Sequence, residues 1–327
     1  MRLPCLVPLA AMVALLASLG CARAHAQPID DDALLDEVSR AAFLYFVEEA
    51  HPVTGLSPDK TSRRDLCSVA STGFGLACYP VGVHNGWITR GQGEELALRA
   101  LRTLEASNAH KHGMFAHFLD METGHATDRG YESVASSIDS ALLCAGALAA
   151  GDYFGGVSRQ CAARLYRRMD WKSFSDPAKL HQVYMAWQPE DPLDFASPGE
   201  FHHQTWNWYT DEALLIAMLA IAAPEPEHRL PREALTNMIR PVEVVNGKPL
   251  VYSWPGTLFT YTFAQCFYDF RVLGPDPARV DWWENTKLAI EANRDWCRSL
   301  AGQYATYGEH RWGITASSGP NNSYLVP

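Results

Sequence analysis

A cluster of aromatic residues runs directly into two neighbouring carboxyl residues near the middle of the chain. The order is Trp206-Asn207-Trp208-Tyr209-Thr210-Asp211-Glu212, followed by an apolar stretch. Aromatic rings stack on the apolar C–H faces of sugar rings, and cleavage of a glycosidic bond needs a positioned pair of carboxyl groups. This segment therefore indicates carbohydrate chemistry.

The sequence predicts different roles for the two carboxyl residues of this segment. By pattern alone, Asp211 is typical of a helix N-terminus, where the helix dipole favours negative charge. Leu214 and Leu215 place a buried environment close to Glu212, and burial raises the pKa of a carboxyl group. A carboxyl that stays protonated near neutral pH can donate a proton, so Glu212 is the candidate acid.

A second acidic cluster lies between residues 110 and 124. Asp120 and Glu122 alternate with apolar residues, as on a short strand that ends in a glycine turn. A turn held by contacts of the Asp side chain is an equally favoured interpretation. The three histidines of this segment lack the i, i+4 spacing of helical zinc motifs, so we expect neutral, hydrogen-bonding His side chains there.

Two further segments carry charged residues near predicted helix ends. Asp139 falls in the first turn of the most apolar helix of the chain, where it is either a helix-dipole residue or, beside a cleft, a group that orients water. Asp269 and Arg271 lie two residues apart near a helix end, and a structural ion pair is the default interpretation there.

Other chemistries find no support in the sequence. There is no Gly-x-Ser-x-Gly elbow and no phosphate-binding glycine loop, which disfavours nucleophilic-serine and nucleotide chemistry. The 27 Lys and Arg against 37 Asp and Glu give a net charge of −10 without a basic stretch, so nucleic acid is not an expected partner. The cysteines show no zinc-site spacing. We therefore expect no metal and no cofactor, and a neutral ligand such as a sugar.

Residues 1–26 have the pattern of a signal peptide. A basic start is followed by an uncharged apolar run over residues 6–19, and Ala24-His25-Ala26 offers a cleavage site. The mature protein is therefore expected to be periplasmic or secreted, and a lipoprotein anchored through Cys21 is the less favoured alternative. No later stretch reaches 18 consecutive apolar residues, so no integral membrane segment is expected in the mature chain.

Helical periodicity dominates the rest of the sequence. It predicts helices over residues 31–49, 89–107, 137–154, 157–169, 211–223, 263–271 and 281–300. The helix over residues 137–154 is almost wholly apolar and is expected to be buried nearly all round. Asn246-Gly247 between two short apolar runs predicts one β-hairpin, and Pro249 marks its second strand as an edge.

Helices of similar length separated by irregular loops indicate stacked antiparallel helical hairpins in one all-α domain over residues 27–327. Long loops over residues 110–136, 171–208 and 237–261 carry most of the polar and aromatic residues. Loops of this length in a globular domain are more often functional than accidental.

Several motifs together resemble the glycoamylase-like domain family of bacteria, whose characterised relatives include endo-β-1,2-glucanases. The matching segments are Cys67-Ser68-Val69-Ala70-Ser71-Thr72-Gly73-Phe74-Gly75-Leu76, residues 112–124, Ser137-Ile138-Asp139-Ser140-Ala141-Leu142-Leu143, Tyr209-Thr210-Asp211-Glu212-Ala213-Leu214-Leu215, Asp269-Phe270-Arg271 and Trp312-Gly313-Ile314-Thr315-Ala316-Ser317. They run in order from about residue 35 to the end of the chain. The resemblance therefore covers the whole of the expected mature protein.

The resemblance implies an (α/α)6 toroid with its cleft at one end of the helical hairpins. It also implies inverting hydrolysis of a β-linked glucan, β-1,2-glucan being favoured, with Glu212 as candidate acid and Asp139 on the base side, although the two roles are interchangeable at this point. The residues expected to bind the saccharide are Asp120, Glu122, His117, Trp206, Trp208, Tyr209, Asp211, Arg271 and Trp312.

The sequence departs from the family pattern in three places. Gln265 stands where relatives often have His, and Ser318 stands where an Asp often follows the Thr-Ala-Ser run. Relatives continue with further helices beyond the point where this sequence ends, so we expect an incomplete toroid that is truncated at the C-terminus. These departures keep open a second hypothesis, a non-catalytic glucan-binding protein with a degenerate site.

Overall fold

The computed structural model describes residues 30–130, 132–179, 181–319 and 323–325. The predicted signal peptide over residues 1–26 lies outside these ranges. The chain divides into two units, Met1–Ala42 and Phe43–Pro327, and the second unit carries every predicted site residue. Helix α2 (Asp31–Glu48) begins in the first unit and ends in the second.

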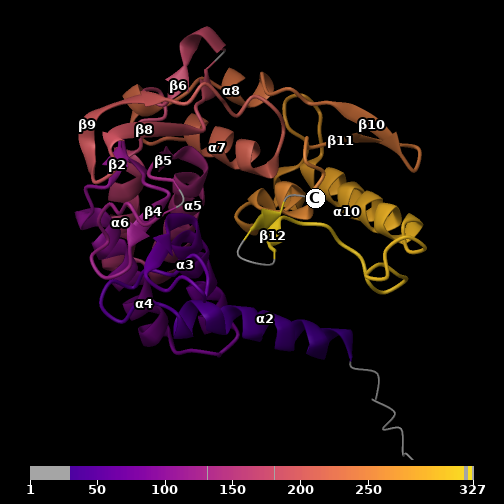
Figure 1. Cartoon of the computed structure of the whole chain (residues 1–327), viewed down its shortest axis with the longest axis horizontal. Coiled ribbons are helices and arrows are strands. Elements are labelled where there is room, and N and C mark those ends of the chain that lie inside the picture. The colour runs from indigo at the N-terminus through magenta and orange to yellow at the C-terminus, as the bar shows by residue number, and fades with distance from the viewer. Residues whose placement is uncertain (1–29, 131, 180, 320–322, 326–327) are drawn as a thin grey trace, which may run out of the picture. The chain divides into compact units, whose positions relative to one another are not determined.

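The protein is mostly helical (Figure 1). After α2, the helices are α3 (Val69–His84), α4 (Arg90–Ala106), α5 (Ser137–Phe154), α6 (Gly156–Arg168), α7 (Asp211–Ile221), α8 (Glu233–Thr236), α9 (Phe270–Leu273) and α10 (Trp282–Ser299). The predictions over residues 31–49, 89–107, 137–154, 157–169, 211–223 and 281–300 are confirmed within about two residues at each end. Helix α3 was not predicted, because it contains Pro80 and is apolar on nearly every side, which leaves no amphipathic period to detect.

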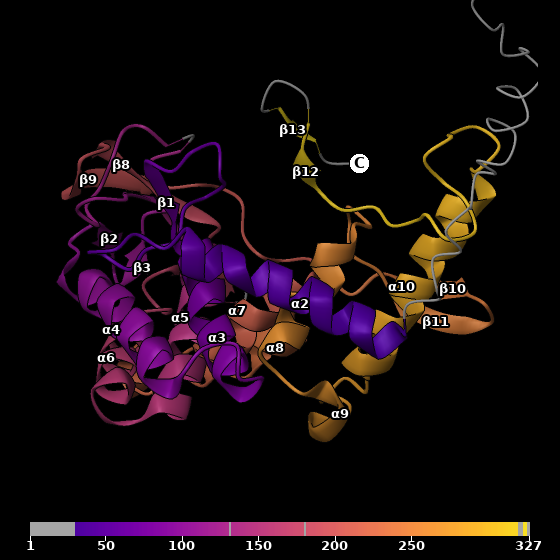
Figure 2. The same ribbon diagram turned by 90° about the horizontal axis from the view of Figure 1, so that it is seen from below.

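Helix α5 lies at the centre of the helical core and packs against α3, α6 and α7 (Figures 1 and 2). Most of its residues are buried, as its apolar sequence predicts. The close approach of α3 and α5 requires glycine on both helices, because a Cβ atom at Gly146 would overlap the carbonyl oxygen of Gly73. A Cβ atom at Gly73 would in turn overlap the backbone at Leu142. This contact sets the close spacing between α3 and α5.

Small sheets occupy the long loops, which corrects the expectation of an all-α chain with a single hairpin. The strands are β1 (Leu66–Ser68), β2 (His110–Lys111), β3 (Met114–Phe115), β4 (Phe118–Asp120), β5 (Ala135–Ser136), β6 (Ser175–Asp176), β7 (Gln182–Val183), β8 (Ala186–Asp191), β9 (Asp194–Phe201), β10 (Val242–Val245), β11 (Lys248–Val251), β12 (Ser317–Ser318) and β13 (Tyr324–Leu325). Many contain two or three residues, too few for a period-2 pattern to be recognised.

These strands hold the starts of two helices. Antiparallel strands β1 and β4 pair with Ser68 opposite Phe118, and β1 leads directly into α3. Strands β5, β8 and β9 form a three-stranded sheet in that order, with Ser136 opposite Ala186, and β5 leads directly into α5. The loops are therefore anchored by backbone hydrogen bonds at the helix N-termini.

The predicted hairpin is confirmed as β10 and β11, with Val245 opposite Lys248. Asn246 and Gly247 have φ values of 51° and 74°, as a two-residue turn of this type requires. The predicted helix over residues 263–271 is wrong: the structure has the 3₁₀ helix η4 (Ala264–Cys266) and then α9. The break arises because the Asp269 side chain caps a new helix by accepting from the Arg271 N–H.

Within the described ranges, no helix has the length and apolar character needed to cross a bilayer.

Candidate active site

The first turn of α7 is built around Asp211, which has no exposed surface. Thr210 caps the helix, since its hydroxyl accepts from the Ala213 N–H at 3.1 Å. One Asp211 oxygen accepts from the Tyr209 hydroxyl at 3.0 Å, and the other accepts from the Ala264 N–H at 3.1 Å. Burial raises the pKa of Asp211 to about 7 despite these hydrogen bonds. Asp211 thus ties α7 to the segment around η4.

Glu212 follows Asp211 and faces an environment that disfavours its charge. Burial, together with the negative charges of Asp139 and Asp211, raises the pKa of Glu212 to about 8. The carboxyl group is therefore mainly protonated at neutral pH. The raised pKa that the neighbouring leucines predicted is present, and Glu212 has the protonation state of a general acid.

Asp139 supplies the second carboxyl of the site from the first turn of α5. Ser136 caps this helix, and its hydroxyl also donates to the Asp139 carboxylate. The Asp139 side chain is only 13% exposed. Because its charge acts on Glu212, the N-terminal turns of α5 and α7 bring their carboxyl groups into one site. This is the pair that the sequence singled out.

His117 lies between Asp139 and a carboxylate that the sequence did not single out, Glu132. Its Nε2 is 3.5 Å from Asp139 Oδ1, and its Nδ1 is 3.9 Å from Glu132 Oε2. The ring stacks on Phe118 with a centroid separation of 3.8 Å. Burial opposes the charged ring, but the two carboxylates outweigh it and raise the pKa of His117. The paired His117 lowers the pKa of Glu132.

Of the predicted aromatic residues, Tyr209 and Trp206 make contacts within the protein, whereas Trp208 is partly exposed to solvent. Tyr209 is fully buried and stacks on Trp282 with centroids 4.5 Å apart. The Trp206 indole N–H donates to the Ser137 hydroxyl at 2.9 Å, which joins the segment before α7 to the first residue of α5. Trp208, by contrast, is 38% exposed. Tyr209 and Asp211 present no surface to a ligand here, so we interpret them as supports of Glu212.

Asp120 and Glu122 make the contacts of a structural turn. One Asp120 oxygen accepts from the N–H groups of Glu122 and Thr123 at 3.1 and 2.9 Å, and the other pairs with Arg129. The Glu122 side chain is 81% exposed and lies 3.7 Å from His51. The strand that carries them ends at Asp120. These contacts are those of the alternative interpretation, a turn held by an Asp side chain.

Arg271 and Trp312 were the remaining predicted binding residues. Arg271 forms the expected ion pair with Asp269 at 2.7 Å, and its guanidinium lies over Trp283 at 5.4 Å from the ring centroid. Trp312 lies in the loop after α10 and is 40% exposed. The described contacts of Arg271 are therefore local.

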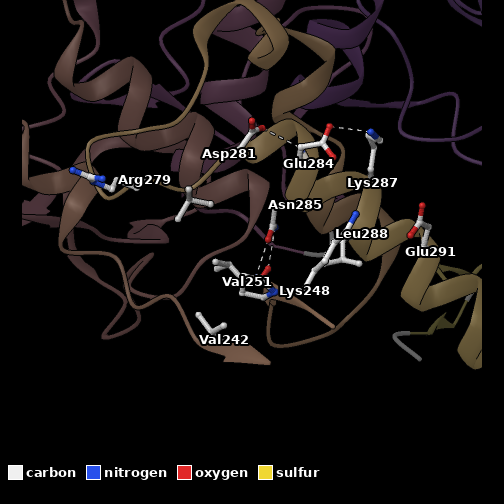
Figure 3. Close-up of a pocket in the computed structure, with 12 residues that line it drawn as sticks. Val242, Lys248, Val251, Arg279, Asp281, Glu284, Asn285, Lys287, Leu288 and Glu291 are labelled. Atoms are coloured by element: carbon white, nitrogen blue, oxygen red, sulfur yellow. Dashed lines mark hydrogen bonds and ion pairs between the residues drawn. The ribbon is translucent and has the colours of Figure 1, made fainter. Parts of the chain in front are cut away.

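A cavity of about 440 Å³ lies between the β10–β11 hairpin and α10 (Figure 3). Asn285 fixes the hairpin to α10, since its side chain exchanges two hydrogen bonds with the backbone of Val251, at 2.8 and 3.0 Å. Glu284 and Lys287 form an ion pair at its rim. None of the residues that line this cavity is a predicted site residue.

A second cavity, of about 220 Å³, borders the start of α7. It is lined by Met185, Thr205, Trp206, Asn207, Trp208, Thr210 and Trp254. Three of these are tryptophans, and the sequence singled out two of them. Trp254 was missed because it stands alone in the long loop over residues 237–261 and joins the others only through the fold. Among the described residues, no group of three or more His, Cys, Asp or Glu side chains is placed to hold a metal ion.

Comparison with known proteins shows what this chain is similar to. Residues 203–325 match the model of the Glycoamylase family, described as "Putative glucoamylase". A curated relative from Parabacteroides distasonis, an exo β-1,2-glucooligosaccharide sophorohydrolase acting at the non-reducing end, is 26% identical over 89% of this chain. The chain spans only 43% of that relative's length.

Solved structures share the fold. A putative glucoamylase from Bacteroides uniformis superposes with a TM-score of 0.79 at 25% identity, covering 91% of this chain and 73% of the other. An endo-β-1,2-glucanase from Chitinophaga pinensis, solved with sophorotriose and glucose, gives a TM-score of 0.77 at 23% identity, covering 91% and 74%. The resemblance inferred from the sequence motifs is confirmed, because residues 203–325 of the chain match the Glycoamylase family model.

Proposed function

We propose that the protein is a glycoside hydrolase that cleaves β-1,2-linked glucan with inversion at the anomeric carbon. The observation that carries the proposal is the placement of the Glu212 carboxyl, whose pKa is raised, at the start of α7, where the Asp139 carboxyl at the start of α5 acts on it. Glu212 holds its proton to about pH 8, and the neighbouring Asp139 charge contributes to that shift. Two titratable groups with diverging environments are the arrangement that acid–base catalysis requires.

In this mechanism Glu212 donates its proton to the glycosidic oxygen as the bond to the anomeric carbon breaks. Asp139 accepts a proton from a water molecule, and the resulting hydroxide attacks the opposite face of the sugar. Inverting enzymes place the two carboxyl groups roughly 6.5–9.5 Å apart so that this water fits between them. The raised pKa favours Glu212 rather than Asp139 as the acid.

The choice of β-1,2-glucan rests on the relatives. The curated relative acts on β-1,2-glucooligosaccharides, and one structural relative binds sophorotriose. The family resemblance also supports an (α/α)6 toroid as the architecture of the domain. The residues 1–26 support export, with a periplasmic or secreted protein as the proposal and lipidation at Cys21 as the less favoured alternative.

A non-catalytic glucan-binding protein is the second candidate, because Ser318 replaces an acidic residue that relatives often carry. The test is reducing-sugar release by the purified chain from linear β-1,2-glucan, with β-1,3- and β-1,4-glucans as controls. We expect release from the β-1,2-glucan alone, and proton NMR of the first products to show the α-anomer. Binding without release in a folded sample would favour the second candidate.

A further inference from the structure

Trp206, Trp208 and Trp254 line one cavity, named here the tryptophan cavity. Its walls are aromatic, while Thr205, Asn207 and Thr210 add polar groups. None of the seven residues that line it is charged. A concave site with apolar walls and a few polar groups is typical of a small-ligand site. The lack of charge points to a neutral ligand.

The tryptophan cavity is attached to both helices that carry the catalytic candidates. Thr210 lines it and caps α7, two residues before Glu212. Trp206 lines it and donates to Ser137, two residues before Asp139. A ligand in the cavity would therefore contact the residue that caps α7. It would also contact Trp206, whose side chain is hydrogen-bonded to the first residue of α5.

Trp254 is held in place although its side chain is 68% exposed. The preceding Ser253 is buried, and its N–H donates to the Tyr261 hydroxyl at 2.9 Å while its hydroxyl bonds to Thr260 at 2.7 Å. The backbone that presents the indole is thus anchored to the core. An exposed Trp on an anchored backbone at the edge of a cavity offers a ring face to a ligand rather than to the core.

We propose that the tryptophan cavity is a binding subsite for one neutral glucosyl unit of the substrate, with Trp254 as the wall on which the sugar ring stacks. The proposal rests on the proposed function and specifies its substrate class. The C–H face of a glucosyl ring matches the indole faces, and its hydroxyls match the Asn207 amide and the threonines. A uronic acid would bring its charge into a cavity whose lining residues are all uncharged.

The test measures binding separately from turnover. The Glu212→Gln variant is titrated by calorimetry with a β-1,2-linked glucotriose, alone and combined with Trp254→Ala, Trp254→Phe or Trp296→Ala. Trp296 is a matched control, because it is 53% exposed on α10 and does not line the cavity. We expect Trp254→Ala to weaken binding at least about tenfold, Trp254→Phe by less, and Trp296→Ala to have no effect.

Two further measurements complete the experiment. A trisaccharide with a uronic acid in place of glucose is expected to bind at least about tenfold more weakly than the glucotriose, as an uncompensated charge requires. Circular dichroism checks that each variant is folded. Equal binding by Trp254→Ala and its parent, or no glucotriose binding at all, overturns the subsite.

The outcomes also separate the subsite from the proposed function. Tryptophan-dependent binding with no β-1,2-glucan hydrolysis by the unmodified chain supports the subsite and contradicts the hydrolase. Hydrolysis by the unmodified chain with no effect of Trp254→Ala on binding supports the hydrolase and contradicts the subsite.

Discussion

At the scale of single residues, the carboxyl groups of Glu212 and Asp139 are chemically similar but have different surroundings. Burial and the negative charges of Asp139 and Asp211 favour the neutral form of Glu212. Asp139 accepts from Ser136 and lies beside the His117 ring. In the proposed mechanism, the acid and base roles therefore follow from what each side chain contacts rather than from its residue type.

The first prediction concerns the proton on Glu212. We expect kcat/KM to fall on the alkaline side with a midpoint near the pKa of about 8, because the acid loses its proton there. Glu212→Gln removes the acid and is expected to lower kcat by about 10²–10⁴-fold. The measurement is the pH–rate profile on β-1,2-glucan. Full activity of Glu212→Gln would remove Glu212 from the acid role.

The second prediction concerns His117, whose pKa is raised by Asp139 and Glu132 against the effect of burial. A His with a raised pKa stabilises the fold below its ordinary pKa, and this stability is lost as pH rises through the folded value. We therefore expect His117→Gln to lower the free energy of unfolding by about 1 kcal/mol more at pH 5.5 than at pH 8.5.

Urea denaturation of the wild type and His117→Gln at the two pH values measures that difference. Glu132→Gln is the matched variant, because it removes one of the two carboxylates and should show the same pH trend with a smaller size. A loss that is equal at both pH values would assign His117 a packing role on Phe118 only.

At the scale of elements, two helices and the strands that lead into them place the carboxyl groups. Strand β5 leads directly into α5, and the Asp211 carboxylate links the start of α7 to η4 by accepting from the Ala264 N–H. The glycine contact between α3 and α5 holds the helix that carries Asp139 close against α3. Small sheets in the loops are thus part of how the site is positioned.

The third prediction tests this glycine contact. Gly146→Ala is expected to destabilise the fold by about 3 kcal/mol or more, because the new methyl overlaps the Gly73 carbonyl in a packed core. Gly91→Ala is the control: its Cβ meets open space on α4, so the change should be neutral or stabilise by up to about 1 kcal/mol. Thermal denaturation compares the two, and equal melting temperatures would contradict the close approach.

At the scale of the whole molecule, several buried titratable groups make stability depend on pH. The raised pKa values of Asp211 and Glu212 mean that the unfolded chain releases these protons at lower pH than the folded one. Stability from these groups therefore decreases as pH rises from about 4 to about 8. Burial and the Arg168 charge lower the pKa of His110 to about 4. The contribution of His110 to stability therefore increases as pH rises from about 4 to its ordinary pKa of about 6.5.

The fourth prediction follows from that balance. Above about pH 6.5 the His110 contribution is complete, so we expect the free energy of unfolding to decrease from pH 6.5 to pH 8.5. Glu212→Gln should flatten this decrease and be more stable than the wild type at pH 8.5. Chemical denaturation across this range measures it, and a stability that rises with pH would be inconsistent with a buried, protonated Glu212.

The sequence by itself determined the helices whose signals are local. The apolar period of α4, the apolar run of α5 and the Asn246-Gly247 turn are signals carried by neighbouring residues, and all three elements appear as predicted. It also pointed to Glu212 as the candidate acid, because aromatic, acidic and apolar residues adjoin in the chain, whereas the family resemblance supplied Asp139 as its partner.

Only the tertiary structure decided how distant residues meet. Glu132 beside His117, and Trp254 beside Trp206, are joined by folding across loops that carry no periodic signal. The helix predicted over residues 263–271 is broken because Asp211 takes the Ala264 N–H and Asp269 caps a new turn. Periodicity reports which side of an element is buried, but the contacts of a site depend on which elements pack together, and that is fixed only when the core forms.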